Sequence, residues 1–115
     1  PMALVTSSSL EAVTFKALPH PWLKRITERV YGDDPELEAG KPDPAPFLLA
    51  AHRLGLDPNR CWALEDSRAG AASALAAGCR VWVLNEQRPT EPRDVNPRHI
   101  NSLEVVLDQL LSTDD

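Results

Sequence analysis

The chain has 115 residues, a net charge of −5 from 12 lysines and arginines against 17 aspartates and glutamates, and 43% hydrophobic residues. This length fits one domain, and the acidic balance excludes wholesale binding of nucleic acid, which requires a basic surface. No apolar run approaches the roughly 20 residues of a membrane-spanning helix, so no membrane partner is expected.

The amino-terminal segment predicts a strand followed by a helix. Residues 3–5 form an apolar run that is typical of a buried strand, and the hydroxyl residues at 6–9 follow it directly. A helix is expected over 9–18, because a serine hydroxyl can cap its first turn and Pro19 ends it.

The rest of the chain alternates strand patterns with helical ones. The expected elements are a helical turn at 22–26, a weak strand at 30–31, a turn at 32–35, a helix at 44–54, a strand at 61–64, a helix at 68–77, a strand at 80–84 and a last helix at 103–111. This alternation predicts an α/β fold in which helices cover both faces of a parallel sheet.

Two segments are expected to stay irregular. Residues 85–101 are polar and contain three prolines, which predicts a surface loop within the domain. Residues 113–115 are expected to fray. The two cysteines, Cys61 and Cys79, form no C-x-x-C pair, and no leader pattern precedes them, so we expect reduced thiols in a cytoplasmic protein.

Polar residues stand where a parallel sheet binds its ligands, at the carboxyl ends of strands. Hydroxyl residues follow the first strand, Glu65 and Asp66 follow the strand at 61–64, and Lys41 lies in a loop between them. Hydroxyls and a lysine suit the oxygens of a phosphate, and adjacent carboxylates suit Mg²⁺. Each piece alone has a plainer explanation as a turn, a solvated lysine or an acidic helix start. Their joint occurrence favours a phosphoryl site.

In these residues the chain resembles the haloacid dehalogenase-like hydrolases, in the branch of sugar-phosphate phosphatases and β-phosphoglucomutase-like enzymes. The resemblance covers nearly all of residues 1–84. Its matching pieces are 2–8, 32–35, 40–44, 65–70 and 76–78. It implies a Rossmann-like three-layer sandwich and a Mg²⁺-dependent enzyme that hydrolyses a small phosphomonoester such as a sugar phosphate.

The resemblance also implies a role for each matching residue. The residues that would bind phosphate or substrate are Thr6, Ser7, Ser8 and Lys41. Of these, Thr6 and Lys41 would be catalytic, because they contact the transferring phosphoryl group. Asp66 would be the direct Mg²⁺ ligand, with Glu65 beside it.

The sequence departs from the family in its first motif, Asp-x-Asp, which supplies the nucleophile and the general acid/base. No aspartate in this sequence has another aspartate two positions later. Residues 1–115 are therefore expected to be the C-terminal part of a core domain that lacks the central first strand and the cap domain. We expect this piece to be inactive alone and to self-associate through unpaired strand edges.

Three alternatives remain open from the sequence. The chain is a non-catalytic remnant or a subunit completed by another chain, it belongs to an enzyme that moves phosphate within a sugar phosphate, or it is a plain phosphate-binding α/β module.

Overall fold

The computed structural model describes residues 1–112, and the expected fraying of 113–115 lies outside them. The helices and strands are, in chain order, β1 (Ala3–Val5), α1 (Leu10–Lys16), η1 (Pro21–Arg25), β2 (Glu28–Val30), α2 (Ala45–Leu54), η2 (Pro58–Arg60), β3 (Trp62–Glu65), α3 (Arg68–Ala77), β4 (Arg80–Leu84), β5 (Arg98–Ile100) and α4 (Glu104–Ser112). The elements η1 and η2 are short 3₁₀ helices. Among these residues, no helix has the length and apolar character needed to cross a bilayer.

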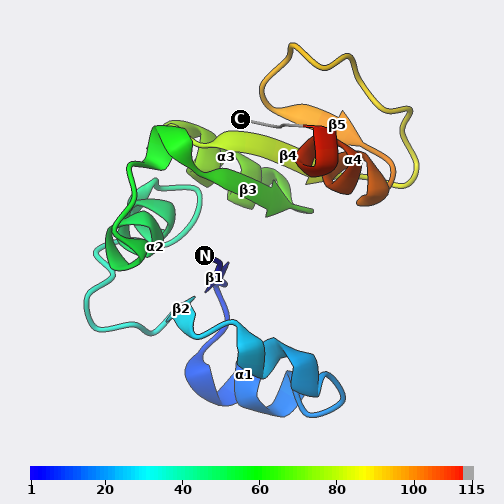
Figure 1. The fold of residues 1–115 in the computed structure, drawn as a ribbon. Coiled ribbons are helices and arrows are strands. Elements are labelled where there is room, and N and C mark those ends of the chain that lie inside the picture. Colours follow the sequence, from blue (N-terminus) through cyan, green and yellow to red (C-terminus); the bar gives the residue numbers. More distant parts are fainter. Residues whose placement is uncertain (113–115) are drawn as a thin grey trace.

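All strand pairs are parallel, and they form two separate sheets (Figure 1). One sheet contains β1 and β2, and the other has the order β3-β4-β5. Within residues 1–112, no strand pairs with the edge of β1 that faces away from β2, nor with the edge of β3 that faces away from β4. The predicted α/β class with parallel strands is confirmed. Within this part of the chain, no strand pairing joins the two sheets, and the gap between them lies between β1 and β3, the strands whose carboxyl ends precede predicted site residues.

Helices cover both faces of the three-stranded sheet, which gives three layers (Figure 1). On one face, α3 packs against alternate side chains of β4, with Ala74 and Val81 completely buried. On the other face, α4 covers Trp82 and Ile100. The core therefore follows from the two-residue alternation along β4, which sends neighbouring side chains to opposite faces.

The element α3 occupies the predicted residues because both of its ends have strong local signals. The Ser67 hydroxyl accepts a hydrogen bond from the Gly70 N–H at 3.0 Å and so caps the first turn. Gly78 ends the helix with φ = 97°, a backbone conformation that favours glycine. As a consequence, β4 begins at Arg80, as predicted.

The predicted loop at 85–101 is wrong in its last part, where Arg98–Ile100 form β5 beside β4. Tertiary contacts, rather than local apolar character, make this strand. Ile100 is completely buried, and the carboxylate of Glu91 accepts a hydrogen bond from the His99 backbone N–H at 2.6 Å. The Glu91 N–H in turn donates to the His99 carbonyl at 2.9 Å. The loop before β5 thus folds back, so that Glu91 forms hydrogen bonds with the backbone of this edge strand.

Candidate functional site

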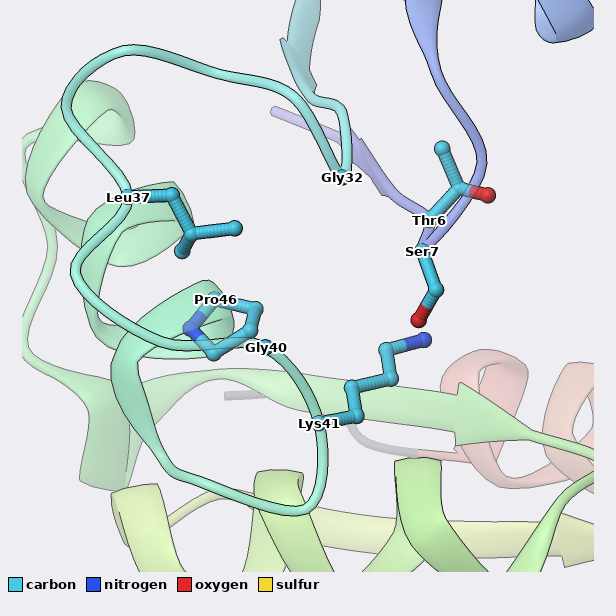
Figure 2. A pocket seen from close by; sticks show the side chains of 7 residues that line it. All are labelled: Thr6, Ser7, Gly32, Leu37, Gly40, Lys41 and Pro46. Carbon is cyan, nitrogen blue, oxygen red and sulfur yellow. The ribbon is translucent and has the colours of Figure 1, made fainter.

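A pocket of about 170 Å³ opens at the carboxyl end of β1 (Figure 2). It is lined by Thr6, Ser7, Gly32, Leu37, Gly40, Lys41 and Pro46. Of the predicted phosphate-binding residues, the structure brings Thr6, Ser7 and Lys41 together here, from segments far apart in the sequence. Lys41 is the one charged residue of this lining, which makes the pocket suited to an anion.

Lys41 spans the interruption between the two sheets. Its Nζ donates a hydrogen bond to the carbonyl oxygen of Val5, the last residue of β1, at 3.2 Å, and it lies 2.6 Å from Oε1 of Glu65, the last residue of β3. The side chains of Lys41 and Glu65 are only 10% and 8% exposed. One largely buried ammonium group therefore links the carboxyl ends of two strands that do not pair.

The loop that carries Lys41 is held by neighbouring helices. The Ser73 hydroxyl of α3 is completely buried and donates to the Asp43 carbonyl at 2.6 Å. The Lys41 ammonium also lies 5.4 Å from the centre of the Phe47 ring in α2. Contacts from two helices thus fix the position of the lysine, so its placement does not depend on a flexible surface loop.

A glycine allows α3 to begin against Glu65. A Cβ atom at Gly70 would collide with the Glu65 carboxylate, whereas the hydrogen atom leaves room for it. Gly70 is also the residue whose N–H bonds the Ser67 cap. The family resemblance at 65–70 therefore has a physical basis. The helix can begin this close to the Glu65 carboxylate only because residue 70 is a glycine.

The three hydroxyl residues after β1 differ in their orientation. In Figure 2 the Ser7 hydroxyl points toward the Lys41 ammonium group, and the Thr6 hydroxyl points away from it. Thr6 Oγ1 accepts from the Ser8 N–H at 3.1 Å, and Ser8 Oγ accepts from Lys16 Nζ at 3.1 Å. Ser7 is thus the hydroxyl that the pocket presents, while Thr6 and Ser8 stabilise the turn.

The two predicted metal ligands lie in different surroundings. Glu65 pairs with Lys41, whereas Asp66 is exposed and lines a second cavity that shares no residue with the first pocket. Among residues 1–112, no group of three or more acidic, histidine or cysteine side chains is placed to hold a metal. Mg²⁺ commonly takes only one or two protein carboxylates and completes its shell with phosphate oxygens and waters, so the exposed carboxylate of Asp66 suits the ion as a ligand, whereas the Glu65 carboxylate is held by Lys41.

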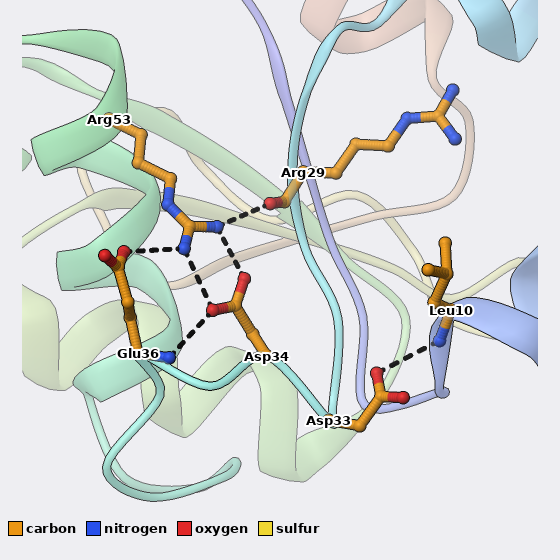
Figure 3. A network of polar contacts seen from close by, with 6 residues as sticks. All are labelled: Leu10, Arg29, Asp33, Asp34, Glu36 and Arg53. Atoms are coloured by element: carbon orange, nitrogen blue, oxygen red, sulfur yellow. Dashed lines mark hydrogen bonds and ion pairs between the residues drawn. The ribbon is translucent and has the colours of Figure 1, made fainter.

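An ion-pair network joins α2 to the segment that follows β2, and the sequence patterns did not reveal it (Figure 3). The Arg53 guanidinium of α2 binds both oxygens of Asp34, at 2.6 and 2.9 Å, and also Glu36 at 2.8 Å. It donates in addition to the Arg29 carbonyl of β2 at 2.8 Å. The network joins α2 to the turn that carries Gly32. Asp34 and Arg53 are nineteen positions apart in the sequence, so no local spacing rule could find the pair.

This network predicts acid sensitivity. The Arg53 guanidinium beside Asp34 lowers the pKa of that carboxyl group below its ordinary value. A carboxyl group with a lowered folded pKa stabilises the protein above its unfolded pKa, and this contribution is lost as the pH falls through the folded pKa. We expect the melting temperature of the wild type to fall more steeply than that of Asp34→Asn between about pH 5 and about pH 2.5. Circular dichroism melts would measure this, and parallel slopes would contradict it.

The fold and the pocket together define a class of protein. Two parallel sheets whose strands bring a lysine, a hydroxyl and acidic residues to their carboxyl ends form a ligand-binding edge suited to phosphate. Residues 1–78 match the family model of the haloacid dehalogenase-like hydrolases. The chain belongs to this family.

Individual relatives agree with this assignment. The chain is 38% identical to hexitol phosphatase A of Escherichia coli over 114 residues, which cover 96% of this chain and 46% of the relative. A Thermotoga maritima structure described as a β-phosphoglucomutase aligns with a TM-score of 0.76 and 25% identity over 95% of this chain and 51% of its own. CbbY from Rhodobacter sphaeroides, in complex with phosphate, aligns with a TM-score of 0.68 and 30% identity over 87% and 45%. The chain thus spans about half the length of these relatives.

Proposed function

We propose that this chain is the phosphate-holding part of a Mg²⁺-dependent phosphohydrolase that acts on a small phosphomonoester such as a sugar phosphate. The observation that carries the proposal is the Lys41 ammonium group, which lies beside the Ser7 hydroxyl and links Val5 to Glu65 at the carboxyl edge. The names of the relatives, a hexitol phosphatase and a protein bound to phosphate, support the same chemistry.

In this proposal the residues act through position and charge. Lys41 offsets the negative charge of the phosphoryl oxygens, and the hydroxyl and backbone N–H of Ser7 hold them. Groups that are already fixed before the substrate arrives need no reorganisation during the reaction, and this is the main source of catalysis in phosphoryl transfer. Asp66, with Glu65 beside it, would hold Mg²⁺, which supplies further neutralisation of charge.

We also propose that the nucleophile comes from a strand outside these residues that fits between β1 and β3, either from another part of the polypeptide or from another chain. The facing edges of β1 and β3, which have no partner strand within residues 1–112, support this placement. The first aspartate of an Asp-x-Asp pair would attack phosphorus and form an aspartyl-phosphate, while the second protonates the departing alcohol. Water then cleaves the acyl phosphate and releases inorganic phosphate.

Asp66→Asn tests this function most cleanly, because Asp66 is exposed and no hydrogen bond or ion pair within residues 1–112 involves its side chain. The chain would be fused to the Asp-x-Asp-bearing part of a family member and assayed with p-nitrophenyl phosphate and Mg²⁺. We expect the fusion to turn over, and Asp66→Asn to lower kcat/KM at least about tenfold through weaker metal binding. Added Mg²⁺ should restore part of the loss.

The matched control is Asp108→Asn, which removes an exposed carboxylate on α4, away from the pocket. It should leave kcat/KM unchanged. Turnover by the 115-residue chain alone would contradict the proposed external nucleophile, and equal activity of the two variants would contradict the role of Asp66. A fusion that binds phosphate but never turns over would favour the non-catalytic alternative. An isomeric sugar phosphate as product, instead of free phosphate, would identify a mutase.

A further inference from the structure

The two cysteines of the chain lie opposite each other at the amino edge of the three-stranded sheet. The parallel register pairs Trp62 of β3 with Arg80 of β4, and each cysteine stands one position before a member of that pair. The Arg80 N–H donates to the Cys61 carbonyl at 3.0 Å, so the ladder extends back to this position. Although the whole of α3 separates Cys61 from Cys79 in the sequence, the two residues are neighbours across adjacent strands.

Both thiols lie on the same face of the sheet. Cys61 and Cys79 pack in one apolar cluster with Ala63 and Val81, which stand two positions further along their respective strands. Side chains two positions apart share a face of a strand, so both sulfur atoms lie on the face that α3 covers. Cys61 also contributes to the raised pKa of the Cys79 thiol, which is an effect of proximity. The two thiols are therefore adjacent in space.

This arrangement suits a disulfide bond. Neighbouring strands lie about 4.8 Å apart, and a disulfide spans Cα–Cα distances of about 4.4–6.8 Å. A partner two positions further along the neighbouring strand would be roughly 8 Å away, which is beyond this reach. The register therefore allows a bridge between directly opposite residues and excludes one between diagonal neighbours.

The two thiols differ in their access to solvent. Cys61 is half-buried, and its thiol contacts the Asp57 carbonyl at 3.4 Å. Burial and the Asp57 carboxylate raise the pKa of Cys61, so its thiolate is scarce and reacts slowly at neutral pH. Cys79 is 3% exposed, and burial raises the pKa of its thiol to about 11. A dissolved oxidant therefore reaches Cys61 first, and Cys79 reacts with the oxidised sulfur at its side.

We propose that Cys61 and Cys79 form a modification site, at which a hydroperoxide oxidises the pair to a disulfide bond that joins β3 to β4. The Cys61 sulfur attacks the peroxide, the O–O bond breaks, and the thiol proton passes to the departing oxygen, which leaves a sulfenic acid on Cys61. The Cys79 sulfur then attacks the Cys61 sulfur, and the hydroxyl group leaves with the Cys79 proton as water. The two thiols lose two electrons, and the peroxide gains them.

The bridge lies at the opposite end of the strands from the proposed phosphohydrolase site. The pocket at the carboxyl edge contains neither cysteine, so the proposal is independent of the proposed function. The loop that the bridge closes runs over residues 61–79 and includes Glu65, Asp66 and all of α3. Closing this loop restricts the unfolded chain, so the oxidised protein should unfold less readily than the reduced one.

Hydrogen peroxide treatment of the 115-residue chain tests the proposal. We expect both free thiols to disappear, the mass of the monomer to fall by two hydrogen atoms, and a peptide map without reductant to show Cys61 linked to Cys79. The melting temperature should rise by at least about 5 °C and return to its original value after dithiothreitol treatment. In Cys79→Ala, peroxide should leave a sulfenic acid on Cys61 that dimedone traps.

The matched control is the double variant Cys79→Ala/Val81→Cys, which keeps two thiols in the same cluster but moves one of them two positions along β4. It should form no bridge within the chain. The proposal is overturned if the wild type keeps both thiols or forms disulfides only between chains, or if the control forms an internal bridge as readily. An unchanged or lower melting temperature after oxidation would contradict the fit of the bridge to the folded register.

Discussion

Lys41→Met is expected to lower the free energy of unfolding by about 3–5 kcal/mol, because it leaves the Glu65 carboxylate, only 8% exposed, without its cationic partner. It also removes the hydrogen bond to the Val5 carbonyl. Urea denaturation followed by circular dichroism would measure the loss. A large effect is expected because an unpaired charge in a poorly solvated position costs far more than the net contribution of the pair.

The double variant Lys41→Met/Glu65→Gln separates these two effects. Removing both charges should recover more than half of the stability lost in the single variant, since no buried charge then lacks a partner. Arg60→Met removes an exposed cation and should change stability by less than about 0.5 kcal/mol. If the single and double variants are equally unstable, the ion pair is not the source of the effect.

Gly32→Ala is expected to destabilise the chain by about 1–3 kcal/mol and to weaken the proposed phosphate binding. A Cβ atom at Gly32 would overlap the Ser7 carbonyl group, which is backbone and cannot rotate away. The Gly32 N–H also donates to the Ser8 carbonyl at 2.8 Å, so the two turns move together. Relief of the overlap must therefore displace the Ser7 hydroxyl from the Lys41 ammonium group. Denaturation and phosphate titration of the Ser7 amide would measure both effects.

Gly40→Ala provides a control within the same pocket. Gly40 lines the pocket as Gly32 does, but a Cβ atom there would meet no atom within 4 Å. We expect unchanged or slightly increased stability, because alanine restricts the unfolded chain more than glycine does. Similar losses in the two variants would mean that general loop rigidity, and not the Ser7 contact, determines the effect.

The bounds of helices and strands were predicted best where capping residues in the sequence mark both ends of the element. The helix at 68–77 has a serine cap and a closing glycine, so its bounds follow from its own residues. The strand at 98–100 could not be found in this way. Its residues are Arg98, His99 and Ile100, and the bonds that define it come from Glu91 and from the neighbouring strand.

The same distinction holds for the site. The rule that ligands bind at the carboxyl ends of parallel strands predicts the grouping of Ser7 with Lys41, which the structure shows in one pocket. The rule does not give side-chain directions. It could not show that the Thr6 hydroxyl accepts a hydrogen bond from the Ser8 N–H, or that Glu65 pairs with Lys41 while Asp66 lines a separate cavity. These details depend on backbone turns and long-range contacts.

In the proposed completion of the sheet by a further strand, the lysine that links the ends of β1 and β3 would also set the thermodynamics. Because the Lys41 ammonium contacts both Val5 and Glu65, the two open edges are held at a fixed spacing. An extended segment that pairs with β1 is then presented to β3 at a high effective concentration. The second ladder forms as an intramolecular step, so the entropy of association is lost only once. Two short ladders, each marginal by itself, would thereby form cooperatively.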